Sequence, residues 1–101
     1  MEKKLHYFIR LLGKRPGWPE DMTPAEEEIM AEHFEYLKKL VAEKRVVMAG
    51  PVWKPTFGLM ILRVDSEAEA RDIMRNEPSV SKGLHTYEMQ PMILSLLMDN
   101  P

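Results

Sequence analysis

Short apolar runs alternate with amphipathic stretches along the chain. Four runs are rich in branched and aromatic residues and stop near Gly, Pro or Asn, which is typical of β-strands. They cover residues 5–12, 46–53, 57–64 and 84–93. A long apolar stripe with helical spacing separates the first two runs, and a shorter amphipathic stretch separates the last two. This order predicts an α+β protein, the ferredoxin-like βαββαβ sandwich, with a four-stranded antiparallel sheet and two helices on one face.

The starts of both helices can be read from local patterns. Thr23 followed by Glu26 is the pattern of a capping box, in which each side chain bonds the backbone N–H of the other residue. The pattern recurs at Ser66 and Glu69 and predicts a shorter helix that ends near Arg75. Residues after this helix, up to the last strand, are expected to form a turn.

The predicted strands are apolar on both faces. In the third strand, Leu59 and Ile61 lie on one face while Met60 and Leu62 lie on the other. A sheet with helices on one face and water on the other should alternate apolar and polar residues. We therefore expect a homodimer formed through the sheet face that carries Met60 and Leu62. The alternative is that scattered methionines are tolerated at the surface of a monomer.

The composition excludes several classes of function. The 101 residues fit a single domain, residues 1–101, and the lack of cysteine excludes disulfides, cysteine-bound metals and thiol catalysis. A net charge of −2 with scattered Lys and Arg gives no basic surface for nucleic acid or an anionic membrane. No apolar run approaches the length of a membrane span. We expect a cytoplasmic protein without a cofactor, which has neither nucleic acid nor a membrane as a partner.

His33 is the first candidate for chemistry. It lies in the middle of the stripe of the long helix, with Ile29, Met30, Tyr36, Leu37, Leu40 and Val41. It therefore points towards the sheet or a cavity, either as a core residue bonded to a backbone carbonyl or as an acid–base group held by a partner. A metal site that joins it to His6 and His85 is not expected. The first and last strands run antiparallel, which places those two residues at opposite ends of the sheet.

Several stretches together resemble the YciI-like (YCII-related) family. They are RPGWPEDMTPAEEEIMAEHFEYLKKL, AGPV, KP and FGLMIL within residues 49–62, SEAEAR, and NEPSVSKGLHTYEMQPM. The resemblance implies a dimeric α/β barrel built from ferredoxin-like subunits. It also implies an active site that pairs a helix histidine, matched by His33, with an aspartate shortly after a Gly-Pro turn.

The chain departs from the family pattern at two positions. Lys54 occupies the place of the expected aspartate, and a cation there would favour a neutral imidazole at His33. Glu77 precedes Pro78 where the family usually has Asp-Pro, and we interpret this change as a detail of the turn. Asp21 or Glu88 could supply the missing carboxylate.

The remaining candidates are weaker and each has a structural alternative. Trp18 and Trp53 flank two loops and line a pocket for a flat small molecule, or only pack. Arg10 binds a carboxylate substrate, or forms a salt bridge to Glu88. Lys54 anchors a small anionic ligand, or points into solvent from a plain strand connection.

Two functions follow from these candidates. The first is a small-molecule enzyme of the lyase or isomerase type, with His33 as the acid–base residue. The second is a non-catalytic module that binds a small ligand or assists another protein, and that has lost the His–Asp pair.

Overall fold

The computed structural model describes residues 4–99, and its elements follow the predicted order with one addition. They are β1 (Leu5–Gly13), α1 (Pro24–Ala42), β2 (Val46–Val52), β3 (Phe57–Val64), α2 (Glu67–Asn76), α3 (Pro78–Ser81) and β4 (His85–Met92). The addition is α3, a single turn of helix in the segment predicted as a turn. It forms because the Glu77 carboxylate accepts a hydrogen bond from the backbone N–H of Ser79 and so caps the turn.

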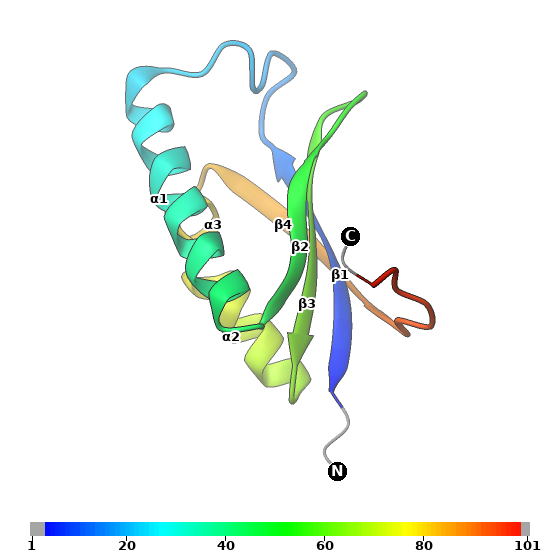
Figure 1. Cartoon of the computed structure of the whole chain (residues 1–101). Helices are drawn as coiled ribbons and strands as arrows, with labels where there is room; N and C mark the ends of the chain where they lie inside the picture. The colour runs from blue at the N-terminus through cyan, green and yellow to red at the C-terminus, as the bar shows by residue number, and fades with distance from the viewer. Residues whose placement is uncertain (1–3, 100–101) are drawn as a thin grey trace.

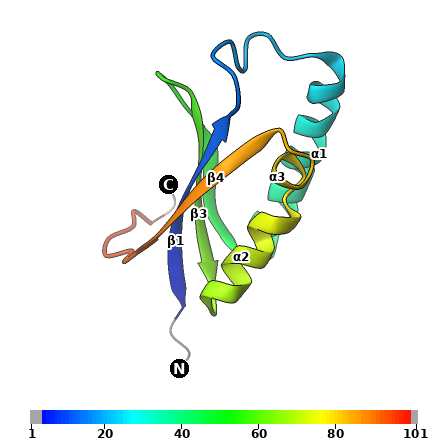
Figure 2. The same ribbon diagram turned by 180° about the vertical axis from the view of Figure 1, so that it is seen from behind.

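The four strands form one antiparallel sheet in the order β2-β3-β1-β4. All three helices lie on one side of this sheet, and Figures 1 and 2 show the opposite side without any helix. This arrangement confirms the ferredoxin-like α+β fold. In the register of β1 with β4, His6 lies opposite Met92 and Gly13 lies opposite His85, so that the two histidines are at opposite ends of the sheet.

Both helix starts are capped by the side chains that the sequence indicates. At α1 the box is complete: Thr23 accepts from the Glu26 N–H at 3.2 Å, and Glu26 accepts from the Thr23 N–H at 2.9 Å. At α2, Ser66 accepts from the N–H of Glu69, but the Glu69 carboxylate bonds the N–H of Asp65 instead, so only half of the box forms. Between residues 4 and 99, no helix has both the length and the apolar content that crossing a bilayer requires.

The hydrophobic core lies between the helices and the sheet. Its largest members come from β1, β3, α1 and α2, namely Tyr7, Ile9, Leu11, Met60, Leu62, Val64, Leu37, Leu40, Ile73 and Met74. Met60 and Leu62 are at most 1% exposed, which shows that their face is the one covered by the helices. The prediction that this face carries a dimer contact is therefore wrong. We call the opposite side, which includes Phe8, Leu59 and Ile61, the open face.

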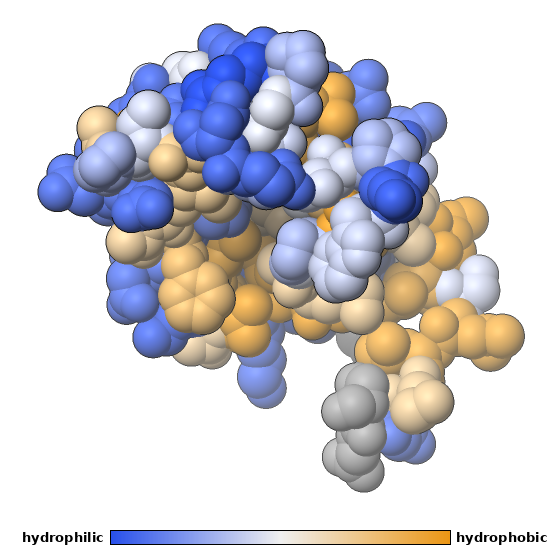
Figure 3. Space-filling view, turned by 90° about the horizontal axis from the view of Figure 1, so that it is seen from above, coloured by the Kyte–Doolittle hydropathy of each residue, from blue (hydrophilic) through white to orange (hydrophobic). Residues whose placement is uncertain are grey.

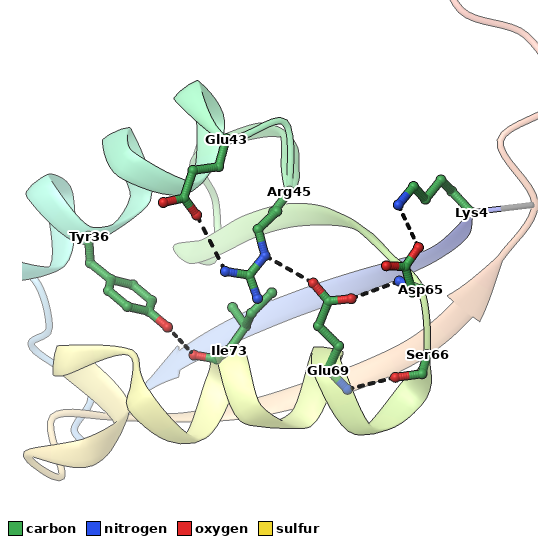
Figure 4. A network of polar contacts seen from close by, with 8 residues as sticks. All are labelled: Lys4, Tyr36, Glu43, Arg45, Asp65, Ser66, Glu69 and Ile73. Carbon is green, nitrogen blue, oxygen red and sulfur yellow. Dashed lines mark hydrogen bonds and ion pairs between the residues drawn. The ribbon is translucent and has the colours of Figure 1, made fainter. Parts of the chain in front are cut away.

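Polar contacts tie the helices together at one end of the molecule (Figure 4). Arg45 donates to Glu69 at 3.0 Å and to Glu43 at 3.4 Å, and so joins the end of α1 to the start of α2. The Tyr36 hydroxyl donates to the backbone carbonyl of Ile73 at 2.8 Å. These bonds hold α1 close to α2 beside the end of β3, whereas α1 and the sheet diverge at the other end of the molecule (Figure 1).

Candidate functional site

A cavity of about 630 Å³ lies between α1 and the sheet, and its lining extends along α1 from Met30 to Ala42. Its helix wall includes Met30, Phe34 and Leu37, and its sheet wall includes Ala49 and Met60. Seen from above, hydrophobic surface surrounds a hollow that has hydrophilic residues along one rim (Figure 3). A concave site with apolar walls is the usual form of a small-molecule site.

The loop from β1 to α1 forms the cover of the cavity through Trp18. A Cβ atom at Gly13 would collide with the Trp18 ring, so only glycine lets the indole pack against the end of β1. Arg15 holds the loop, since it donates to Asp21 at 2.9 Å and to Glu26 at 2.6 Å, and its guanidinium lies 5.5 Å from the Trp18 ring centre. The hydrogen bond from Arg15 is the main reason why the pKa of Glu26 falls to about 2.

His33 and Glu77 form a close pair at the edge of the cavity. Nδ1 of His33 lies 2.6 Å from Oε1 of Glu77, and His33 also lines the cavity. The Glu77 side chain has no exposed surface, whereas that of His33 is 13% exposed. Ser79 completes the carboxylate's surroundings, with its backbone N–H at 3.1 Å from Oε1 and its hydroxyl bonded to Oε2.

These contacts determine the charge of Glu77 and the orientation of the imidazole. Burial raises the pKa of the Glu77 carboxyl, but the hydrogen bonds from His33 and Ser79 outweigh it and bring the pKa below its ordinary value. An ionised carboxylate can only accept, so Nδ1 of His33 carries a proton and donates it to Oε1. Nε2 is then the nitrogen of His33 that can gain or lose a proton.

His85 is a second buried imidazole beside this pair. Its ring centre lies 6.2 Å from that of His33 and 5.4 Å from that of Trp18, with the Trp18 contact edge-on. Burial, and then the neighbouring His33, lower the pKa of His85 below its ordinary value. The two rings together give the cavity a polar corner in otherwise apolar walls.

Of the six residues that the sequence suggests for binding, Trp18 lines the cavity and the other five do not. Arg10 and Glu88 lie on the open face with Nε of Arg10 3.9 Å from a Glu88 oxygen, and the Arg10 guanidinium stacks over Phe57. Asp21 bonds Arg15 in the cover loop. Trp53 and Lys54 are exposed at the turn between β2 and β3, and their part in binding a ligand stays a prediction.

The turn that carries Trp53 and Lys54 forms only part of a wall of the cavity. Its flanking residues line the cavity, among them Pro51 and Thr56, while Lys54 is exposed and absent from the lining. Among the lining residues, which all belong to the described part of the chain, the single Lys or Arg is Lys38. It pairs with Glu35 at 3.3 Å on the exposed side of α1.

The carboxylate partner of His33 is not one of the residues that the sequence suggests. Neither Asp21 nor Glu88 contacts the His33 imidazole, and Lys54 does not occupy the position of the carboxylate that does. The partner is Glu77, which we interpreted from the sequence as a turn detail. A signal was present, because the carboxylate stands immediately before Pro78, at a position that caps a helix, but the pattern did not say that it faces a residue 44 positions away.

The histidine–carboxylate pair has a geometry that is compatible with proton transfer. No group of three or more His, Cys, Asp or Glu side chains within residues 4–99 is arranged to hold a metal ion. Instead, a carboxylate fixes one nitrogen of an imidazole whose ring borders an apolar cavity, which is the arrangement of a general acid or base. The fold and this pair define a class: small ferredoxin-like subunits with a histidine–carboxylate pair at a ligand-sized cavity.

Comparison with known proteins identifies the family within this class. The sequence model of the YCII-related domain matches residues 9–93, and the chain belongs to the YCII-related domain family. It is 40% identical over 57 residues to the uncharacterised protein YjpA of Bacillus subtilis (strain 168), a match that covers 56% of this chain and 67% of YjpA.

A solved structure is similar across most of the chain. It is 5-chloro-2-hydroxyhydroquinone dehydrochlorinase (TftG) from Burkholderia phenoliruptrix AC1100, in complex with 2,5-dihydroxybenzoquinone. The TM-score is 0.63 at 21% identity, and the match covers 83% of this chain and 90% of the other. At this level of identity the likeness shows the fold, which is that of the dimeric α/β barrels.

Proposed function

We propose that the protein is a small-molecule enzyme of the lyase or isomerase type, in which His33 transfers a proton to or from the substrate. One observation carries this proposal: the 2.6 Å contact between Nδ1 of His33 and a fully buried Glu77 carboxylate, at the edge of a cavity of about 630 Å³. A histidine needed only for packing would not require a buried charge beside it, because burial of a carboxylate is costly unless it is paired.

The pair supplies the two features that a general base needs. Glu77 holds the imidazole in one tautomer, with Nδ1 protonated, so that Nε2 has a free lone pair. When Nε2 takes a proton, the resulting imidazolium lies against the carboxylate and is stabilised by it. Base-initiated eliminations and isomerisations begin with the removal of a proton from carbon or oxygen, and His33 can then return that proton as an acid.

The structural neighbour supports the class of chemistry. Its name describes a dehydrochlorinase and its structure contains 2,5-dihydroxybenzoquinone, a small flat ring. A ring of that size suits a cavity with apolar walls on both sides and polar groups in one corner. We therefore propose a small, flat, oxygen-bearing molecule as the substrate of this protein too.

The alternative, a binding module without catalysis, has lost its main support. The sequence suggests this alternative because Lys54 occupies the position expected for the aspartate, whereas Glu77 places a carboxylate against His33. The arrangement at His33 is that of a complete pair.

We also propose that two copies associate through the open face. It has no helix over it (Figure 1), and half-buried Phe8 and Leu59 lie there together with exposed Met48. The structurally similar dehydrochlorinase has the dimeric α/β barrel fold, in which two such subunits pair. Apolar residues on a face that no helix covers favour association with a second copy of the same surface.

Hydrogen exchange at carbon tests the proposed activity. The protein is incubated in deuterium oxide with a panel of phenols, hydroxyquinones and small β-dicarbonyl compounds, and the loss of carbon-bound hydrogen is followed by proton NMR. We expect the wild type to accelerate exchange in at least one compound and His33→Gln to lose about 10²–10⁴-fold of that rate.

Lys54→Ala is the matched control, because Lys54 is exposed and outside the cavity lining. Its exchange rate should equal that of the wild type. If the wild type is no faster than His33→Gln for every compound, the proposed proton transfer is refuted.

A further inference from the structure

His85 has a ring nitrogen that the protein itself leaves unused. The residue is 6% exposed and lines the cavity, yet its Nδ1 is shielded from solvent and has no hydrogen-bond partner within residues 4–99. Buried polar groups are nearly always paired, and an unpaired buried N–H is rarer than an unpaired acceptor. A neutral ring therefore keeps Nδ1 bare and carries its proton on Nε2, the ring nitrogen that is not among the shielded atoms without a partner.

The charge state of His85 agrees with this tautomer. Burial and the nearby His33 lower its pKa, while Glu77 acts in the opposite direction and does not outweigh them. The ring is then neutral near neutral pH, with a single N–H to donate. Trp18 packs edge-on against it at 5.4 Å between ring centres and restricts its movement.

The distance between the two imidazoles allows both to contact one ligand atom. A ring nitrogen lies about 1 Å from its ring centre and a hydrogen bond spans about 2.8 Å, so an oxygen about 4 Å from both centres can bond both rings. The centres of His33 and His85 are 6.2 Å apart, less than twice that distance. The planes are inclined by 62°, so the rings meet edge-on and are not stacked.

We infer that His85 is a second ligand-binding residue of this site: its Nε2–H donates to the same ligand oxygen whose proton passes to Nε2 of His33. In this step the ligand O–H bond breaks, an N–H bond forms at His33, and the electron pair stays on the oxygen. The new negative charge faces the His85 N–H, and the new positive charge on His33 faces Glu77. The inference deepens the proposed function by naming its substrate class, which is flat molecules with an acidic hydroxyl, such as phenols, hydroxyquinones and enols.

Binding of 4-nitrophenol tests this inference, because its absorbance reports whether it is ionised. The control ligand is 4-nitrotoluene, which has the same shape but no hydroxyl. The variant His85→Phe keeps an aromatic ring against Trp18 and removes the N–H, while His85→Gln places an amide N–H near the former position of Nε2. A thermal melt of each variant checks its folding, and His85→Leu, which also lacks an N–H, carries the test if His85→Phe does not fold.

We expect the wild type to bind 4-nitrophenol in its ionised form and in preference to 4-nitrotoluene. His85→Phe should lose about tenfold to a hundredfold in affinity for 4-nitrophenol and lower its ionised fraction, with little change for 4-nitrotoluene. His85→Gln should recover part of the loss. Equal losses for both ligands would show that His85 only shapes the wall, and no loss, or no preference in the wild type, would overturn the inference as well.

The deuterium exchange assay separates this inference from the proposed function. If His33→Gln abolishes exchange and His85→Phe leaves it intact, the proposed function stands and the role of His85 is refuted. If both variants exchange like the wild type, both are refuted.

Discussion

The substitution Glu77→Gln examines the site most directly, because it keeps the size of the side chain and removes its charge. The carboxylate has no exposed surface and receives three hydrogen bonds, from Nδ1 of His33 and from the N–H and hydroxyl of Ser79. An amide has only one oxygen to accept them. One of the donors must then face an NH₂ group or rotate away.

The size of the effect follows from the type of bond lost. Hydrogen bonds to a charged group contribute about 1.5–3 kcal/mol, against about 0.5–1.5 kcal/mol between neutral groups. Since the pKa of Glu77 is lowered despite its burial, the folded protein stabilises the ionised form. We expect Glu77→Gln to lower the free energy of unfolding by about 1–3 kcal/mol at neutral pH, a large share of the about 5–15 kcal/mol of an ordinary domain.

The loss should depend on pH in a defined direction. A carboxyl whose pKa is lower in the folded than in the unfolded state stabilises the fold above its unfolded pKa, and this contribution disappears as the pH falls through the folded pKa. The difference in stability between wild type and Glu77→Gln should therefore be largest at neutral pH and shrink below the ordinary value of 4.5. Glu26, whose pKa is also lowered, is present in both proteins and cancels in the difference.

Urea titrations at about pH 7 and about pH 3.5, followed by the fluorescence of half-buried Trp18, measure this difference. Glu28→Gln is the matched control, since Glu28 is exposed on α1 and should change stability by less than about 0.5 kcal/mol. The exchange rate of Glu77→Gln in deuterium oxide should also fall about tenfold or more, because the imidazolium loses its counter-charge. If wild type and Glu77→Gln have the same free energy of unfolding at neutral pH, or if their difference grows on acidification, Glu77 is not a buried, ionised partner of His33.

Three further predictions concern the open face, the cover loop and the turn after β2. Phe8→Lys should convert a dimer to a folded monomer in light scattering, because an ammonium buried in the contact costs several kcal/mol. The control Ala68→Lys, at an exposed position of α2, should leave the mass unchanged. A dimeric Phe8→Lys would exclude the open face as the contact between the two copies. Arg15→Ala should release the cover loop, seen as a change in Trp18 fluorescence and weaker ligand binding, and an unchanged spectrum would show that the loop holds itself. Lys54→Asp should change neither stability, within about 1 kcal/mol, nor the affinity for small carboxylates, and a loss of that affinity would restore Lys54 as an anion anchor.

The fold could be predicted because its signals are local. The capping pair Thr23 and Glu26 lies within one turn of helix, and the four strands differ from the helices in apolar spacing. What the pattern did not determine was which face of the sheet the helices cover. Both faces are apolar in β3, so Met60 and Ile61 were equally good candidates for the core, and only the packing of α1 and α2 distinguishes them.

The site could be predicted only in part because its pair joins distant segments. His33 stood out as a polar residue in an apolar stripe, but the position of its partner depends on how α2 ends against α1. Glu77 ends α2 and caps α3 at once, and that capping role made it look structural. The sequence suggests His85 only as part of a metal site with His6 and His33, and its place 6.2 Å from His33 between ring centres depends on how α1 packs against the sheet.

The carboxylate of Glu26 has two tasks that make the cover and the helix a single mechanical unit. One of its oxygens accepts both the Thr23 N–H, which starts α1, and the guanidinium of Arg15, which holds the cover loop. The loop cannot swing aside without weakening the first turn of the helix that carries His33. Movement of the loop that carries Trp18 and fraying of the first turn of α1 are therefore thermodynamically coupled, so that the stability of one helix end determines how firmly this wall of the cavity is held.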